Sequence, residues 1–130
     1  AARLLPLYSD TETPEESLET LAATIAEEMP IAVLLLGMGA DLHTASLFPG
    51  ADRLDDALAR NAPVLLPMRA PGAAEPRITL SAPVLNGALR KHVLIYGAEK
   101  RAALEGARGM APEQAPINAV ISEARVHWAA

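Results

Sequence analysis

The sequence contains no cysteine. Disulfide frameworks, thiolate zinc sites and cysteine nucleophiles are therefore all excluded. This absence is compatible with a reducing compartment, and we expect a cytoplasmic protein. Aromatic residues are also scarce, at 3% of the chain, and the formal net charge is −5. Surfaces that bind nucleic acids combine basic clusters with aromatic side chains, so we expect no nucleic-acid partner.

Long hydrophobic runs are absent as well. No run approaches the roughly 18 to 20 apolar residues that cross a bilayer, and no signal peptide is recognised at the start of the chain. We therefore expect a soluble protein without membrane contact. A chain of 130 residues is long enough to bury a core of its own, so residues 1–130 are expected to form one domain. The sequence leaves the oligomeric state open, and a monomer is favoured.

Apolar runs of strand length alternate with segments of helical periodicity. The run 31–36 has no polar alternation, which is typical of a parallel strand buried on both faces. A helix is predicted from a Thr13 cap, through Pro14 and Glu16, to its end at Pro30. Further helices are expected at 52–60, 82–90, 98–107 and 118–121, and further strands at 63–66, 77–80, 92–96 and 125–128. This alternation predicts an α/β fold: a three-layer, Rossmann-like, doubly wound and mostly parallel sheet.

A glycine-rich loop follows the run 31–36, where parallel sheets bind their ligands. It reads Gly37-Met38-Gly39-Ala40-Asp41-Leu42-His43-Thr44-Ala45-Ser46-Leu47-Phe48-Pro49-Gly50. Gly37 and Gly39 permit the backbone to approach an anion closely. Asp41 and His43 lie two residues apart and can face one cleft, and Thr44 adds a hydroxyl group.

These features alone leave the function open. A Gly-x-Gly after a strand is more often a simple turn, and a single histidine more often has a structural role. The dinucleotide-binding fingerprint requires a third glycine where this chain has Leu42, which disfavours a nicotinamide cofactor. The three histidines, His43, His92 and His127, are too scattered in the sequence to indicate a metal site.

The loop closely resembles the signature of 6-phosphogluconolactonases, in which Asp-Gly-His-Thr-Ala-Ser-Leu-Phe-Pro-Gly follows a glycine-rich turn. Segments resembling the same family follow in order at 76–81, 85–86, 97–100, 116–120 and 126–128. The resemblance runs from about Ile31 to the end of the chain. It implies membership of the glucosamine-6-phosphate isomerase/6-phosphogluconolactonase superfamily.

The sequence departs from this family in two respects. Leu42 stands where the family usually has glycine, and we expect a neighbouring glycine to adopt any positive φ that the turn requires. The family also carries a Ser-Gly-Gly phosphate loop and an Asp-Glu-Arg segment, and neither occurs here. The sequence therefore resembles the C-terminal portion of a 6-phosphogluconolactonase, and we expect an incomplete domain that lacks its N-terminal part.

The resemblance implies hydrolysis of 6-phospho-D-glucono-1,5-lactone to 6-phospho-D-gluconate in the oxidative pentose phosphate pathway. An imidazole titrates near neutral pH, so His43 is the expected general base for water, with Asp41 as its orienting partner. Backbone N–H groups from Gly37 to Gly39 are the expected oxyanion donors. The expected substrate-binding residues are Gly37, Gly39, Thr44, Arg77 and Lys100, with Lys100 and then Arg77 as the phosphate cations. No metal or other cofactor is expected, and the only partner expected is the phosphorylated sugar lactone.

Two alternatives remain open. Glucosamine-6-phosphate deaminases have a related Asp-Gly-His loop, but that family continues with Asn-Glu-Pro, which places a carboxylate where this chain has Phe48. Phe48 therefore favours the lactonase. The second alternative is a non-catalytic domain that binds a sugar phosphate on the same sheet, and the presence of Asp41 and His43 speaks against it.

Overall fold

Three parallel strands form the main sheet of the molecule. The computed structural model describes residues 1–130, and the sheet contains β1 (Leu34–Gly37), β4 (Lys91–Tyr96) and β5 (Arg125–Ala129). The strand order is β1-β4-β5, with Leu34 opposite Lys91 and His92 opposite Arg125. The chain reaches β4 from β1, and β5 from β4, through helical crossovers, as parallel pairing requires. The predicted α/β class and its parallel sheet are confirmed.

A separate antiparallel pair lies between β1 and β4 in the sequence. It consists of β2 (Leu65–Met68) and β3 (Arg77–Leu80), and it is not hydrogen-bonded to the main sheet. Both strands were expected, β3 with the same bounds and β2 two residues earlier. Their antiparallel pairing was not foreseen, because an alternating pattern of strands and helices indicates parallel pairing without showing where one hairpin replaces it.

The α-helices are shorter than the sequence suggested, and the 3₁₀ helix begins two residues before the helix predicted at 118–121. Their bounds are α1 (Glu15–Ala26), α2 (Leu54–Leu58), α3 (Ala82–Asn86), α4 (Ala98–Gly106) and the 3₁₀ helix η1 (Pro116–Ala119). None of them has the length and apolarity needed to cross a lipid bilayer. At the start of α1, the Thr13 backbone N–H donates to Glu16 Oε1 at 3.0 Å, which is one half of the predicted capping box.

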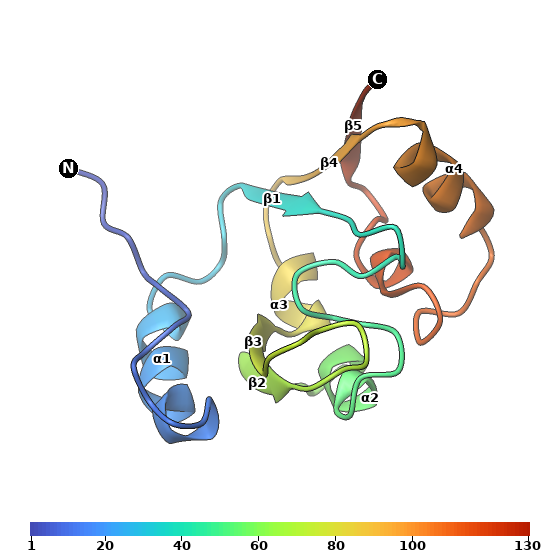
Figure 1. The fold of residues 1–130 in the computed structure, drawn as a ribbon. Helices are drawn as coiled ribbons and strands as arrows, with labels where there is room; N and C mark the ends of the chain where they lie inside the picture. The colour runs from blue at the N-terminus through green and yellow to red at the C-terminus, as the bar shows by residue number, and fades with distance from the viewer.

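The hydrophobic core lies on one face of the main sheet. Leu34 and Leu36 of β1 and Val93 and Ile95 of β4 are buried there. They pack with side chains from the loop after β1, the hairpin and the helices: Met38, Leu47, Leu54, Ala57, Leu66, Met68, Leu85, Ile117 and Val120. Figure 1 shows why only one face is covered, because α2, α3 and the β2–β3 hairpin all lie on the same side of β1 and β4.

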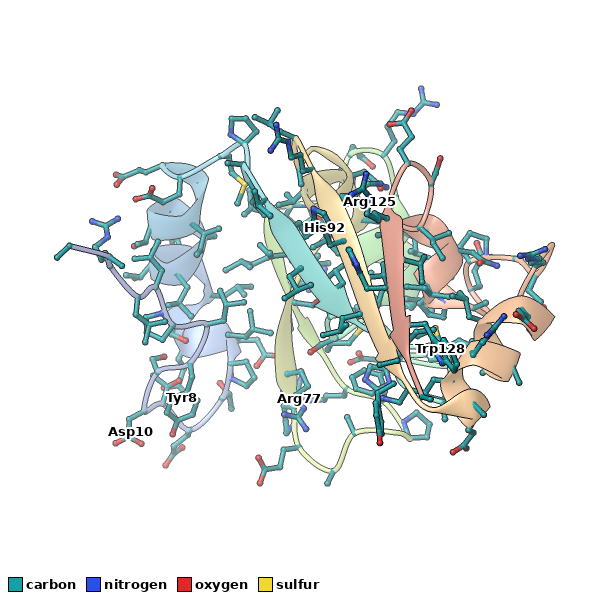
Figure 2. All side chains as sticks on the ribbon, turned by 90° about the horizontal axis from the view of Figure 1, so that it is seen from above. Tyr8, Asp10, Arg77, His92, Arg125 and Trp128 are labelled. Atoms are coloured by element: carbon teal, nitrogen blue, oxygen red, sulfur yellow. The ribbon has the colours of Figure 1, made fainter.

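The opposite face of the sheet is open, which corrects the expectation that the first strand is buried on both faces. Leu35 of β1 retains 65% of its surface exposed, and Leu94 of β4 retains 53%. Val33 and Tyr96 are exposed on the same face of the sheet, since each lies two residues from Leu35 or Leu94. Figure 2 looks onto this open face, which no helix crosses.

Candidate active site

A cavity opens where the carboxyl ends of β1 and β4 meet. Its volume is about 420 Å³, and it is lined by Leu35, Leu36, Gly37, Met38, Gly39, His43, Ala45 and Lys100. The loop after β1 supplies most of this lining, and the first turn of α4, which follows β4, supplies Lys100. Four of the predicted site residues, Gly37, Gly39, His43 and Lys100, are therefore brought together. Their place at the strand ends is where open α/β sheets bind ligands.

Asp41 and His43 form a hydrogen-bonded pair at this cavity. His43 Nδ1 lies 2.5 Å from Asp41 Oδ1, and the His43 backbone N–H donates to the same oxygen at 3.2 Å. An ionised carboxylate can only accept hydrogen bonds, so Nδ1 is assigned as the donor. The other ring nitrogen, Nε2, has no hydrogen-bond partner in the protein. The His43 side chain is 32% exposed, so this nitrogen is accessible to a small ligand.

The environment of Asp41 keeps its carboxyl group ionised. Partial burial acts to raise the pKa of Asp41, but hydrogen bonds from the ring and the backbone N–H of His43 outweigh it. The net effect holds the pKa of Asp41 below its usual value. The carboxylate can therefore fix one orientation of the imidazole ring at neutral pH.

Gly39 is required for the close approach of this pair. A Cβ atom on Gly39 would lie 2.5 Å from Asp41 Oδ1 and would overlap the His43 ring. The Gly39 backbone N–H donates to the His43 carbonyl at 3.0 Å, which closes the turn. That N–H is thus occupied and cannot serve as the predicted oxyanion donor.

Leu42 adopts the left-handed backbone conformation that the sequence analysis assigned to a neighbouring glycine. Its φ is +73°, whereas neither Gly37 nor Gly39 has a positive φ. The expectation was therefore wrong, and the residue that replaces the family's glycine carries the strain itself. Two contacts hold it in place: its carbonyl accepts the Ile117 N–H at 3.1 Å, and its side chain packs against the core.

Phe48 contacts the histidine directly, a role that the sequence analysis did not assign to it. Its buried ring stacks on the His43 ring, with 4.2 Å between centroids and 22° between planes. Gly72, in the loop between β2 and β3, completes the arrangement. A Cβ on Gly72 would lie 3.2 Å from Asp41 Oδ2 and 3.4 Å from Phe48 Cδ1. The proline- and glycine-rich composition of that loop was the only available signal, and it does not specify a contact.

Two predicted binding residues do not line the cavity. Thr44 is 1% exposed, and its hydroxyl donates to the Gly37 carbonyl at 2.8 Å, so it braces the loop. Arg77 begins β3 opposite Met68 and is exposed. Figure 2 shows Arg77 at the same end of the molecule as Trp128, which marks the carboxyl end of β5. Lys100, in contrast, lines the cavity and forms no ion pair in the protein.

No three His, Asp or Glu side chains gather into a group that could hold a metal ion. The sequence suggested that the three histidines are scattered, but two of them lie together in the structure. His92 Nδ1 and His127 Nε2 lie 2.9 Å apart on neighbouring strands. A larger hollow of about 550 Å³ lies between α4 and β5; its lining includes the Arg101–Glu105 ion pair but no histidine.

Comparison with known proteins gives one consistent result. The family described as glucosamine-6-phosphate isomerases/6-phosphogluconolactonase matches residues 1–128. The 6-phosphogluconolactonase of Rhizobium meliloti is 37% identical over 98% of this chain and 58% of its own length. That of Mesorhizobium japonicum is 38% identical over 99% of this chain and 56% of its own length. The chain thus spans little more than half the length of the curated relatives that it matches.

Comparison with solved structures points to the same family. A 6-phosphogluconolactonase from Shewanella baltica superimposes with a TM-score of 0.88 at 28% identity. The match covers 95% of this chain and 55% of that one. A protein from Neisseria gonorrhoeae, described as a putative 6-phosphogluconolactonase, superimposes with a TM-score of 0.81 at 26% identity, covering 97% and 58% of the two chains.

Proposed function

The chain belongs to the glucosamine-6-phosphate isomerase/6-phosphogluconolactonase family, and on that premise we propose that it supplies the base for hydrolysis of 6-phospho-D-glucono-1,5-lactone to 6-phospho-D-gluconate. The relatives above are named 6-phosphogluconolactonases, which supports this substrate. The observation that carries the proposal is the Asp41–His43 pair, with its unpartnered Nε2, at a cavity that also contains Lys100.

His43 is the proposed general base. With the Nδ1 proton donated to Asp41, the lone pair of Nε2 is available to remove a proton from water. The resulting hydroxide adds to the lactone carbonyl, and the imidazolium then returns the proton to the ring oxygen as the C–O bond breaks. The Asp41 carboxylate stabilises the charged ring between these two transfers.

The remaining cavity residues serve charge and orientation in this proposal. Lys100 is the proposed phosphate contact, because it is a cation on the cavity wall without a carboxylate partner. Arg77 lies outside the cavity lining, and its role as a second phosphate contact stays a prediction. Gly37 and Gly39 form part of the cavity wall. The cytoplasmic location and the monomeric state stay predictions.

The packing of Phe48 favours hydrolysis over deamination. Its ring covers one face of the His43 ring at 4.2 Å. The deaminase alternative has a carboxylate at this position in the sequence, whereas here an apolar ring occupies it. The arrangement therefore provides one acid–base pair, as ester hydrolysis needs, and no second carboxylate for ring opening and amine release.

The test is lactone hydrolysis by this chain extended with the part of the Rhizobium meliloti relative that it does not match. We expect turnover, and we expect His43→Ala to reduce it by about 10² to 10⁴, the range for general acid–base catalysis. Binding of 6-phosphogluconate should change little in that variant, and added imidazole should restore part of the rate. Turnover that survives His43→Ala unchanged would contradict the proposal, and ligand binding without turnover in the parent protein would favour the non-catalytic alternative.

A further inference from the structure

The turn between β4 and α4 determines where Lys100 lies. Lys100 is in the first turn of α4, which begins at Ala98, and its side chain lines the cavity that contains His43. A helix often begins with a residue whose side chain accepts a hydrogen bond from one of the first N–H groups. Here the N-cap residue is Gly97, and α4 has no side-chain cap. Other contacts must therefore fix the start of this helix.

Gly97 is held by two hydrogen bonds to β5. Its backbone N–H donates to the Ala129 carbonyl at 2.8 Å, and its carbonyl accepts the indole N–H of Trp128 at 3.0 Å. The same carbonyl accepts the Arg101 N–H, the first hydrogen bond of α4, at 3.4 Å, which is long for such a bond. The φ of Gly97 is +86°, a conformation that glycine adopts without strain. The indole therefore makes the shorter of the two bonds at this carbonyl.

Packing keeps the indole ring in the position that this bond requires. Trp128 lies opposite Ile95 in the sheet, at the carboxyl end of β5 and next to α4 (Figure 2). The Arg101 guanidinium lies over the ring, 4.6 Å from its centroid, and the Arg101 Nε is paired with Glu105 Oε1 at 3.1 Å. The half-buried ring thus connects the last strand of the sheet to the first turn of α4.

We infer that Trp128 is a positioning residue: its indole N–H holds the Gly97 carbonyl, and through it the first turn of α4, so that Lys100 faces the cavity. Lys100 follows Gly97 by three residues, so a shift of this turn displaces the ammonium group. Trp128 does not itself line the cavity, and it acts on a ligand there only through Lys100. The inference rests on the proposed function in one respect, that Lys100 contacts the phosphate group of the lactone.

This role predicts an effect on substrate binding and not on the chemical step. Asp41 and His43 lie on the loop after β1, and none of their hydrogen bonds involves α4 or β5. Loss of the indole N–H should therefore leave the acid–base pair aligned while Lys100 moves. A tryptophan that only stabilised the fold would instead affect KM and kcat without regard to Lys100.

The test uses the extended chain described above with the substitution Trp128→Phe, which keeps an aromatic ring beneath Arg101 and removes the donor. We expect KM for the lactone to rise roughly 3- to 10-fold with little change in kcat, the effect of one neutral hydrogen bond. The Kd of 6-phosphogluconate should rise by the same factor. In the Lys100→Ala background the substitution should add nothing, because its effect passes through that side chain. Arg101→Ala keeps the indole donor and is the matched control, with an unchanged KM.

Amide hydrogen exchange provides a readout that needs no substrate. In Trp128→Phe, the Arg101 amide should exchange roughly 3- to 10-fold faster, because losing one hydrogen bond favours local opening of the turn. The Val93 amide, in the middle of β4, should keep its rate. If Trp128→Phe does not fold, the benzothienyl analogue of tryptophan at this position is the second variant. It replaces the indole N–H with sulfur in a ring of the same size.

Two results would overturn the inference: an unchanged exchange rate at Arg101, or a rise in KM that is equally large in the Lys100→Ala background. A fall in kcat at constant KM would also contradict it, since the acid–base pair would then depend on Trp128. If the extended chain neither hydrolyses the lactone nor binds 6-phosphogluconate, the lactonase proposal fails. The exchange measurement then still decides whether Trp128 anchors the turn, so the two failures are distinguishable.

Discussion

Replacing Gly39 with alanine tests whether the backbone of the turn holds the Asp41–His43 pair together. A Cβ at this position would lie 2.5 Å from Asp41 Oδ1 and would overlap the imidazole ring. The backbone cannot retreat easily, because the Gly39 N–H is bonded to the His43 carbonyl and the Gly39 carbonyl accepts the Leu42 N–H, both at 3.0 Å. We therefore expect the ring and the carboxylate to separate.

The expected loss of stability follows from the Asp41–His43 hydrogen bond that is broken. Hydrogen bonds to charged groups contribute roughly 1.5 to 3 kcal/mol. His43 is 32% exposed and Asp41 44% exposed, so solvent screening places the loss at the lower end, about 1 to 2 kcal/mol. For a chain of this size, such a loss lowers the melting temperature by roughly 4 to 8 °C. A ring displaced by about 1 Å should also slow hydrolysis by roughly 10².

Thermal unfolding, monitored by circular dichroism, measures the fall in melting temperature. Gly106→Ala is the matched control, because a Cβ there meets no atom within 4 Å and the residue ends α4. We expect that control to be neutral or stabilising by up to about 1 kcal/mol, since alanine favours helix. If Gly39→Ala unfolds at the same temperature as Gly106→Ala and keeps the His43–Asp41 contact in its NMR spectrum, the reasoning about this turn is refuted.

Three further predictions concern the same site. At neutral pH, Asp41→Asn should be less stable than the parent protein. The pKa of Asp41 is lowered in the folded protein, so the stabilisation from the Asp41–His43 pair is present above the ordinary pKa of an aspartate and is lost as pH falls through the folded pKa. The melting temperatures of the two proteins, measured from pH 7 to pH 3, should therefore approach each other as the pH falls. Lys100→Ala should raise KM for the lactone by roughly 10- to 100-fold with little change in kcat, the loss of one charge-assisted hydrogen bond. The control is Arg101→Ala: the Arg101 guanidinium lies over Trp128 and not at the cavity, so this variant should leave KM unchanged in the same initial-rate assay. Phe48→Leu should reduce kcat by up to about tenfold at constant KM, because stacking contributes about 0.5 to 1.5 kcal/mol to the ring's orientation; a change confined to KM would contradict that assignment.

Much of the fold could be predicted because short-range patterns determine it. Strand β3 has its predicted bounds, and β4 and β5 match within one residue at either end. The helix over 82–90 ends early, at Asn86, where the Gly87 N–H bonds back to the Pro83 carbonyl. The antiparallel hairpin and the open sheet face could not be foreseen. Both depend on which segments meet in space, and hydrophobic alternation does not encode that.

The candidate site was predicted in part. Asp41, His43 and Lys100 lie together because a motif and the strand-end rule both point to one edge of the sheet. The stacking of Phe48 and the approach of Gly72 were missed, because each is a contact between side chain or backbone atoms that no spacing specifies. The positive φ was expected at a neighbouring glycine, because steric clashes disfavour it for leucine. In the structure Leu42 adopts it, because its tertiary contacts outweigh this steric cost.

The most direct test of the account is the protonation pattern of the His43 ring in a long-range ¹H–¹⁵N correlation spectrum above neutral pH. The account predicts a proton on Nδ1, donated to Asp41, and an unprotonated Nε2 facing the cavity. Asp41→Asn should remove this preference. A spectrum that shows the proton on Nε2 in the parent protein would contradict the assignment of His43 as the base.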